Sequence, residues 1–362
     1  YSFGAYAQSP YIPRALPLLN NGVEVMLSTE YSRTDSVADV DGDESKLFTG
    51  ESGSQIDIDL NLGYGLTNNL QLNLGLKARQ VQSTFLYDGG SGEEELSLSN
   101  SGLESTFIGF KYGFDEVERS RFSLEGWYRF PAYSNEIYVS GEPDTIALGE
   151  GSREYAIGGS YSVMTKASNV LEASLFYRSP GEDISPEFLT TISYSLVGKR
   201  FALYGGYEYL KSTEDDAYTD DINSKPRVFQ GVTSKYNSIN RQWSAPFIGL
   251  NVALGKTFRI ETRYTQVISG VSTDLGPRVL VSLVRRSERL GNDHTRRDAQ
   301  FKEYSIEAVV EKISKSRKVV IINKGAAGGV EKGMKIDFYY FDFLGGNELI
   351  ATGVVLKTKL NK

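Results

Sequence analysis

An acidic cluster, "DVDGDES" at residues 39–45, is the stretch whose spacing comes nearest to metal chemistry. Carboxylates at alternate positions around a glycine resemble the ligands and the turn of a calcium-binding loop. Neither the glycine nor the last glutamate stands where that pattern requires it, so a solvated acidic loop is the plainer interpretation. The sharper one is a weak site for Ca²⁺ or Mg²⁺, with Asp39, Asp41, Asp43 and Glu44 as its ligands.

The sequence contains few residues that could support catalysis or another kind of metal site. The chain contains no cysteine, which removes thiol nucleophiles and cysteine-bound zinc, and it contains one histidine, His294. A serine–histidine hydrolase needs its histidine next to the nucleophile, and His294 lies in a polar stretch far from the apolar segments. We therefore predict that the protein is not an enzyme and has no cofactor other than a cation at the acidic loops. No nucleic-acid partner is predicted.

Charged residues occur at the middle of otherwise apolar segments, as in "QIDIDLNLGY". Charges at such positions are costly in a dry core but tolerable in a wet lumen. Both signs are present, whereas an ion-selective pore more often has one dominant sign. The plainer interpretation is a salt-bridged, water-containing interior that need not conduct. The residues predicted to face this lumen are Asp57, Asp59, Lys77, Arg79, Lys111, Glu125, Arg129, Arg259, Glu261 and Arg263.

The elements that must position these charges are strands, because apolar and polar residues alternate with a period of two. No run approaches the 18 apolar residues that a membrane helix needs, but a spanning strand needs only every second residue apolar. Twelve such segments are present: 22–33, 55–64, 70–77, 102–114, 121–130, 153–163, 170–178, 187–196, 200–209, 245–254, 257–267 and 277–284. The residues predicted to face lipid are Val23, Val25, Leu27, Ile56, Ile58, Leu60, Leu70, Leu72, Leu74, Leu76, Ile108, Phe110, Phe122 and Leu124.

The connections between these segments alternate between short and longer. The short ones are predicted at 65–69, 114–120, 163–169, 197–200 and 254–257, and the longer ones at 34–53, 83–101, 131–150, 179–187, 211–241 and 268–276. Short turns on one side and long loops on the other are typical of a transmembrane up-and-down antiparallel β-barrel. A soluble β-sandwich with Greek-key links is the alternative, and it gives no reason for this alternation. The sequence therefore predicts an all-β protein with a barrel of about twelve strands.

Several hairpins resemble a known class of proteins. "GLTNNLQL", "SGLESTFIGFKYGF", "FSLEGWYRFPAY" and "LGEGSREYAIGGSYS" are similar to hairpins of Gram-negative outer-membrane β-barrels of the porin and hydrophobic-compound-transporter kind. The resemblance covers about residues 20–285 and implies an outer-membrane location, with lipids including lipopolysaccharide as partners. A cation at the acidic loops would then bridge them to lipopolysaccharide phosphates. The chain departs from such barrels because it continues well beyond the last predicted strand.

The C-terminal part reads as a small soluble β-barrel-like domain at 304–362, after a polar linker at 286–303. Its "VVIINKGAAGGVEKGMKIDFY" resembles the C-terminal domain of the flagellar assembly protein T family. The positions Gly325, Gly329 and Gly333 fit the turns of that family, whose last strand is missing here, so an incomplete domain is expected. An even strand number returns the chain to its starting side, so both termini are predicted to be periplasmic, with residues 1–21 as an N-terminal segment or plug of the barrel at 22–285.

Two functions remain open. An appended domain favours a barrel that anchors a periplasmic adaptor, as a structural subunit of an oligomeric envelope assembly whose contacts run through residues 286–362. The alternative is a monomeric outer-membrane channel or transporter for small or hydrophobic molecules. The N-terminal "SPYIPRALPLL" could occlude so narrow a barrel in either case.

Overall fold

The computed structural model describes residues 11–88, 93–114, 120–138, 144–165, 169–181, 184–198, 200–255, 257–287, 306–315, 319–342 and 346–360. The chain forms two compact units, Tyr1–Leu290 and Gly291–Lys362. Each unit is described by itself.

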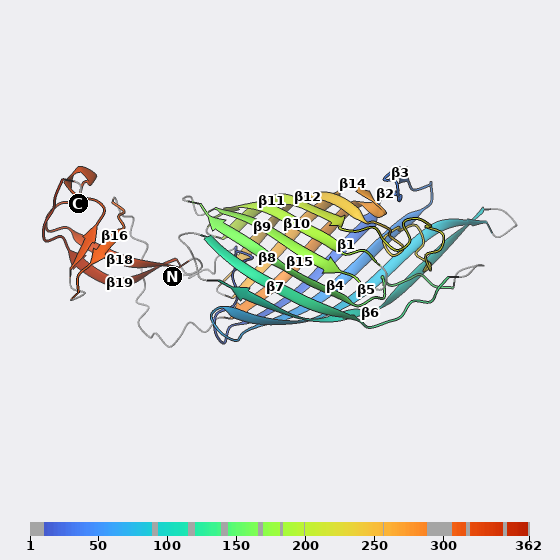
Figure 1. Cartoon of the computed structure of the whole chain (residues 1–362), viewed down its shortest axis with the longest axis horizontal. Helices are drawn as coiled ribbons and strands as arrows, with labels where there is room; N and C mark the ends of the chain where they lie inside the picture. Colours follow the sequence, from blue (N-terminus) through green and yellow to red (C-terminus); the bar gives the residue numbers. More distant parts are fainter. Residues whose placement is uncertain are drawn as a thin grey trace, which may run out of the picture. The chain divides into compact units, whose positions relative to one another are not determined.

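The first unit is a closed antiparallel β-barrel in which each strand pairs with the next along the chain and the last pairs with the first (Figure 1). The twelve predicted spans are all present, which confirms the predicted fold class. The barrel strands are β1 (Val23–Thr34), β4 (Ser52–Gly65), β5 (Leu70–Asp88), β6 (Glu93–Gly113), β7 (Ser120–Pro131), β8 (Glu154–Met164), β9 (Val170–Ser179), β10 (Glu187–Val197), β11 (Phe201–Ser212), β12 (Gln242–Leu254), β13 (Phe258–Val267) and β15 (Thr273–Ser287).

The alternation in sequence becomes the two faces of the wall, because successive side chains of a strand point to opposite sides. Leu74 opposes Leu62 on the outer face and is 53% exposed, whereas Asp57 opposes Arg79 on the inner face and is 5% exposed. Among the residues predicted to face lipid, the exposed ones are Val23, Leu27, Ile58, Leu72, Leu74, Leu76, Ile108, Phe110 and Phe122, and the half-buried ones are Val25, Ile56, Leu60, Leu70 and Leu124.

The connections keep the predicted alternation, with two corrections. The stretch 268–276, expected to be a longer connection, is mostly strand, because only Ile268 and Ser272 lie outside strands there. The stretch 83–101, expected to be a long loop, is mostly strand, because β5 and β6 continue pairing as far as Asp88 and Glu93. The backbone groups of this long hairpin satisfy one another, so its polar composition does not end the strands. On the same side, β2 (Ser36–Ala38), β3 (Glu44–Lys46) and β14 (Ser269–Val271) pair with neighbouring strands over the long loops.

Buried apolar clusters lie toward the two ends of the barrel interior. At the short-turn end Tyr11 packs with Val170 and Ala202. At the long-loop end there are two clusters, one around Trp243 and Leu275 and one of Val81, Ile146 and Leu148. The described interior is therefore packed at both ends.

The second unit contains β16 (Val310–Ile313), β17 (Val320–Ile322), a 3₁₀ helix η1 (Ala326–Gly328), β18 (Lys335–Asp342) and β19 (Gly346–Val354). Its strands form two separate antiparallel pairs, β16–β17 and β18–β19, so the described residues do not close into the small barrel that the sequence suggested. None of the helices in the described part of the chain has the length and apolar character to cross a membrane.

Candidate functional site: the barrel interior

The inner wall carries oppositely charged residues on consecutive strands. Arg79 on β5 lies between two acids: its Nε is 2.6 Å from Asp57 Oδ1 and its NH1 is 3.9 Å from Glu104 Oε1. Arg129 on β7 pairs with Glu104 at 3.5 Å and also contacts Glu154 on β8. Because each charge has an opposite charge on the next strand, the interior pays little unpaired-charge penalty in this region.

The alternation continues around the wall and into the loops. Arg178 on β9 is 2.6 Å from Glu154 and 3.7 Å from Glu187 on β10. Arg241, just before β12, is 2.8 Å from Glu187 and 2.6 Å from Glu150 of the loop after β7. We call these nine residues the charge belt: Asp57, Arg79, Glu104, Arg129, Glu154, Arg178, Glu187, Arg241 and Glu150.

Glu104 joins the charge belt through a β-bulge. In the β5–β6 ladder Lys77 opposes Ser105 while Ala78 opposes Leu103, so Glu104 has no partner of its own. A bulge of this kind turns two successive side chains to one face. Glu104 and Ser105 are accordingly both buried, at 6% and 1% exposure.

Glu150 ties a long loop to the charge belt and lies outside the strands. Burial alone would raise the pKa of its carboxyl group, but the guanidinium groups of Arg241, Arg129 and Arg178 lower the pKa below its usual value. Glu150 therefore remains charged at neutral pH and holds the loop against the wall.

Further ion pairs lie elsewhere on the inner wall, on β4 to β7 and on β11 and β13. Lys77 is 3.5 Å from Asp59, Lys111 is 3.6 Å from Glu125, and Arg263 is 2.7 Å from Glu208 on β11. Arg259 and Glu261, two residues apart on β13, pair with each other at 2.5 Å. The structure thus places all ten residues predicted to face the lumen in ion pairs with other inner-wall residues.

The N-terminal segment, residues 11–22, lies inside the barrel at its short-turn end. The Leu18 amide donates to Gln71 Oε1 on β5 (2.8 Å), and Arg286 on β15 donates to the Pro17 carbonyl (3.1 Å). A Cβ on Gly65 would lie 2.0 Å from the Leu19 carbonyl oxygen, so the segment passes too close to β4 for any larger residue there. Arg286 was assigned to the linker by sequence, but it is an inner-wall residue of β15, 3.7 Å from Glu24.

Glu172 on β9 is the main anchor of the N-terminal segment. Its carboxylate accepts hydrogen bonds from the Tyr11 hydroxyl, from the Arg14 amide (2.5 Å) and from the Ser162 hydroxyl (2.8 Å). Lys111 on β6 donates to the Arg14 carbonyl at 2.8 Å. The segment therefore contacts β5, β6, β8, β9 and β15 from within the barrel.

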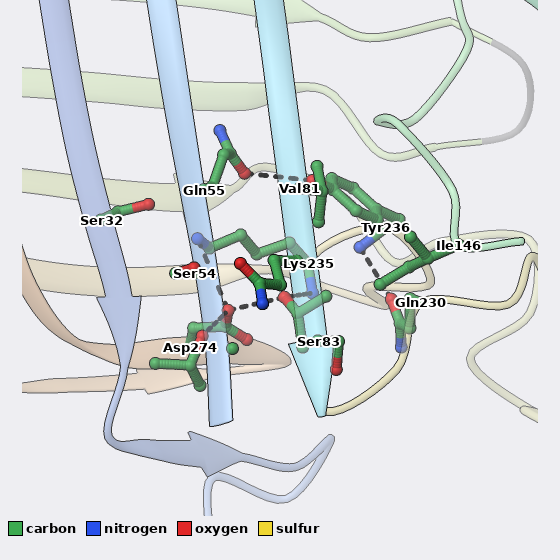
Figure 2. Close-up of a pocket in the computed structure, with 14 residues that line it drawn as sticks. Ser32, Ser54, Gln55, Val81, Ser83, Ile146, Gln230, Lys235, Tyr236 and Asp274 are labelled. Carbon is green, nitrogen blue, oxygen red and sulfur yellow. Dashed lines mark hydrogen bonds and ion pairs between the residues drawn. The ribbon is translucent and has the colours of Figure 1, made fainter. Parts of the chain in front are cut away.

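The other end is narrowed by the loop residues 132–138, 144–153 and 213–241, and Figure 2 shows part of this closure. Asp274, buried at the start of β15, accepts from the Ser234 amide (2.7 Å) and the Thr233 hydroxyl (2.6 Å) and lies 3.4 Å from Lys235 Nζ. Burial lowers the pKa of Lys235, against the opposing effect of Asp274. Tyr236 reaches across to donate to Gln55 on β4 at 3.0 Å (Figure 2).

Between these two closures lies a cavity of about 180 Å³, here called the chamber. Its lining comes from the N-terminal segment and from β9, β10, β11, β12, β13 and β15. The lining residues are Tyr11, Arg14, Glu172, Ala173, Ser174, Thr191, Ser193, Tyr204, Phe247, Glu261, Arg263 and Leu280. The interior thus offers a small space with charged, hydroxyl and aromatic groups on its walls.

The acidic cluster forms the turn between β2 and β3. Asp39 Oδ1 accepts the amides of Asp41 and Asp43, both at 2.9 Å, and Glu44 accepts the Ser36 hydroxyl at 2.7 Å. Across the described ranges, no three acidic or histidine side chains converge in a way that could hold a metal ion. The arrangement of Asp39, Asp41, Asp43 and Glu44 therefore gives the predicted cation site no support, and the carboxylates of Asp39 and Glu44 are engaged within the turn itself.

Sequence reasoning missed part of the site. Glu104, Glu154 and Glu187 were not among the predicted lumen residues, because Glu104 depends on a bulge and the other two begin their strands at a segment boundary. Arg241 and Glu150 lie in loops, and only the fold brings them to the wall. His294 lies outside the described residues.

The barrel resembles solved structures of outer-membrane proteins. An outer-membrane channel from Pseudomonas putida has a similar structure, with a TM-score of 0.54 and 12% identity over 76% of this chain and 99% of that chain. The NanC porin (TM-score 0.41, 8% identity, 72% and 99% covered) and a Pseudomonas aeruginosa FadL homologue (0.36, 10%, 78% and 96%) are more distant. No protein-family model matches the chain, and no curated protein matches it by sequence. The fold is therefore that of an outer-membrane β-barrel, while the resemblance of the C-terminal unit to flagellar assembly protein T is not shown.

Proposed function

We propose that this protein is a channel for small molecules in the outer membrane of a Gram-negative bacterium, and that the structure is its closed conformation. The observation that carries the proposal is the polar, ion-paired interior with a chamber between two closures. A barrel with only a structural role needs no interior cavity, whereas a channel needs polar groups along the path of its solute. The Pseudomonas putida protein of the same fold, an outer-membrane channel, supports this choice over the anchoring hypothesis.

The orientation follows from the same proposal. Short turns face the periplasm in barrels of this kind and long loops face outward. The N-terminal segment would then close the periplasmic end, and both termini would be periplasmic. The proposed solutes include hydrophobic molecules, because Phe247 and Leu280 line the chamber beside its charged groups.

Conductance in planar lipid bilayers tests the proposal. We expect the full chain to give rare, small open levels, because both ends are narrowed. Deleting residues 1–19 should give stable open levels several-fold larger. Heat-modifiable migration of the deletion variant on gels checks that its barrel is folded, and a folded deletion variant without any open level would contradict the proposal.

The second candidate is the anchoring role, which the C-terminal unit favours. That unit is compact on its own, and its described part exposes large apolar side chains such as Ile350 (63%), Leu356 (69%) and Leu360 (72%). Apolar surface of this kind often marks a contact with another protein. An oligomer in mild detergent that is lost on deleting residues 291–362 would favour the anchor, and a monomer unaffected by the deletion would favour the channel.

A further inference from the structure

Arg14 stands out in the chamber because no carboxylate of the described residues lies within 4.0 Å of its guanidinium, although Arg14 and Glu125 interact electrostatically at longer range. Its backbone is fixed by Glu172 and Lys111, which directs the side chain along the inner wall. The guanidinium lies over the Phe176 ring, 5.1 Å from the centroid, and its NH1 donates to the Ser174 hydroxyl at 3.3 Å. Arg14 is exposed, and no carboxylate of the described chain lies within ion-pair distance of it. It is therefore a solvated cation held inside the barrel.

Arg263 presents a second guanidinium to the chamber from β13. Its NH1 pairs with Glu208 at 2.7 Å, and its plane lies over the Phe247 ring at 5.4 Å. Its Nε is buried and has no acceptor among the described residues. That atom is closed off from the chamber, but the Arg263 side chain is 26% exposed and lines the chamber, so the exposed part of its guanidinium can donate to a bound solute.

The acidic groups of the chamber are already engaged. Glu172 accepts three hydrogen bonds from the protein, and Glu261 Oε1 takes both the Nε and the NH2 of Arg259. The unmet hydrogen-bonding capacity of Arg14 and Arg263 is that of donors. A ligand that completes these groups must bring acceptor oxygens, and guanidinium groups suit the two oxygens of a carboxylate.

The remaining lining sets the size and the body of such a ligand. Tyr204, Phe247 and Leu280 form an apolar side of the chamber. A volume of 180 Å³ equals that of roughly six waters at their share of the liquid, which suits a molecule of about ten non-hydrogen atoms.

We propose that the chamber is a binding site for a small carboxylate with an aromatic or compact apolar body, held by Arg14 and Arg263 with its body against Phe247 and Tyr204. This inference rests on the proposed channel and names the class of solute that it recognises. Because Arg14 belongs to the N-terminal segment and Arg263 to the wall, the ligand would bridge the closure and the barrel.

Isothermal titration calorimetry on the full chain in detergent tests the site, with benzoate as the probe and benzamide as its neutral match. We expect benzoate to bind at least ten-fold more tightly than benzamide, and R14Q and R263Q each to weaken benzoate binding at least ten-fold. R33Q is the matched control, because Arg33 pairs with Asp35 on the exposed edge of β1 and is remote from the chamber. R14Q removes no ion pair, so it remains informative if R263Q fails to fold.

Equal affinity for benzoate and benzamide, no measurable heat with benzoate, or an unchanged affinity in a folded R14Q variant would each overturn the site. Conductance of the same preparations separates the two proposals. Benzoate binding in a protein that never conducts leaves the site standing and removes the channel. Conductance without any benzoate preference removes the site and leaves the channel standing.

Discussion

Glu154 is, after Glu187, the most enclosed carboxylate of the charge belt, at 1% exposure between Arg129 and Arg178. Its neutralisation would leave two inner-wall guanidinium groups without their shared partner. Breaking a buried ion pair from one side costs about 3 kcal/mol or more. Charge-belt residues are therefore expected to contribute to barrel stability individually.

Glu154→Gln should lower the free energy of unfolding of the barrel by about 3 kcal/mol, because Arg129 and Arg178 each lose a buried ion pair. Guanidinium chloride unfolding in lipid vesicles measures the change. Glu95→Gln, at an exposed position in the long β5–β6 hairpin, is the control and should change the stability by less than about 0.5 kcal/mol. Equal effects of the two substitutions would contradict a structural role for the charge belt.

Glu150 makes the loop closure sensitive to acid. Its pKa in the folded protein is lowered from 4.5, so its ionised form stabilises the loop fully at pH above 4.5, and this contribution is lost as the pH falls through the lowered value. We expect the hydrogen-exchange protection factors of residues 144–153, taken relative to unstructured peptide at the same pH, to fall as the pH drops below about 4.5. Glu150→Gln should make exchange in that loop fast already at neutral pH, and an identical pH profile in the variant would count against the clamp.

At the scale of the elements, the N-terminal segment depends on glycines in the strands that it crosses. Gly65 accepts the Asn21 amide at 2.8 Å and donates to the Gly22 carbonyl at 2.9 Å, and it leaves no room for a Cβ beside Leu19. Side chains at this position and the segment therefore compete for the same space.

Gly65→Ala should displace the N-terminal segment and raise single-channel conductance several-fold while the barrel stays folded. Gly102→Ala on β6 is the control, because its Cβ would meet nothing closer than 3.5 Å. A conductance unchanged by Gly65→Ala in a folded barrel would show that this segment does not close the path.

Substitutions at two positions of β5 test which part of its outer face lies in the bilayer. Leu74 is exposed on the outer face in the middle of the apolar run, while Gln82 is exposed on the same face farther along the hairpin. Leu74→Lys should destabilise the barrel by about 2 to 4 kcal/mol in lipid vesicles, because a lysine near the bilayer midplane is costly. Gln82→Lys should cost less than about 1 kcal/mol, and a similar cost at both positions would contradict the proposed membrane position.

At the scale of the whole molecule, the two compact units are expected to fold independently. The barrel closes by pairing β15 with β1, so its backbone groups need nothing from the second unit. A chain ending at residue 290 should therefore insert into vesicles, keep heat-modifiable migration and conduct like the full chain. Loss of insertion in this variant would show that the second unit is needed for assembly.

The wall of the barrel can be predicted from local sequence patterns. Alternation with a period of two is a local property, so Leu70, Leu72, Leu74 and Leu76 can be placed on one face from the sequence alone, and the twelve spans with their short and long connections follow. The opposite charges of Asp57 and Arg79 could also be assigned to one interior. The long β5–β6 hairpin could not be predicted as strand, because its polar residues are typical of a loop and only cross-strand pairing shows that they belong to a sheet.

The contents of the barrel interior depend on contacts that form only in the folded chain. The bulge at Glu104, the approach of Glu150 and Arg241 from separate loops, and the passage of Arg14 beside Glu172 all join residues far apart in the chain. These contacts depend on barrel closure and register, which fix which side chains share a level of the interior. Local periodicity therefore predicts the wall. The closures, the charge belt and the chamber arise from long-range packing, which no local pattern encodes.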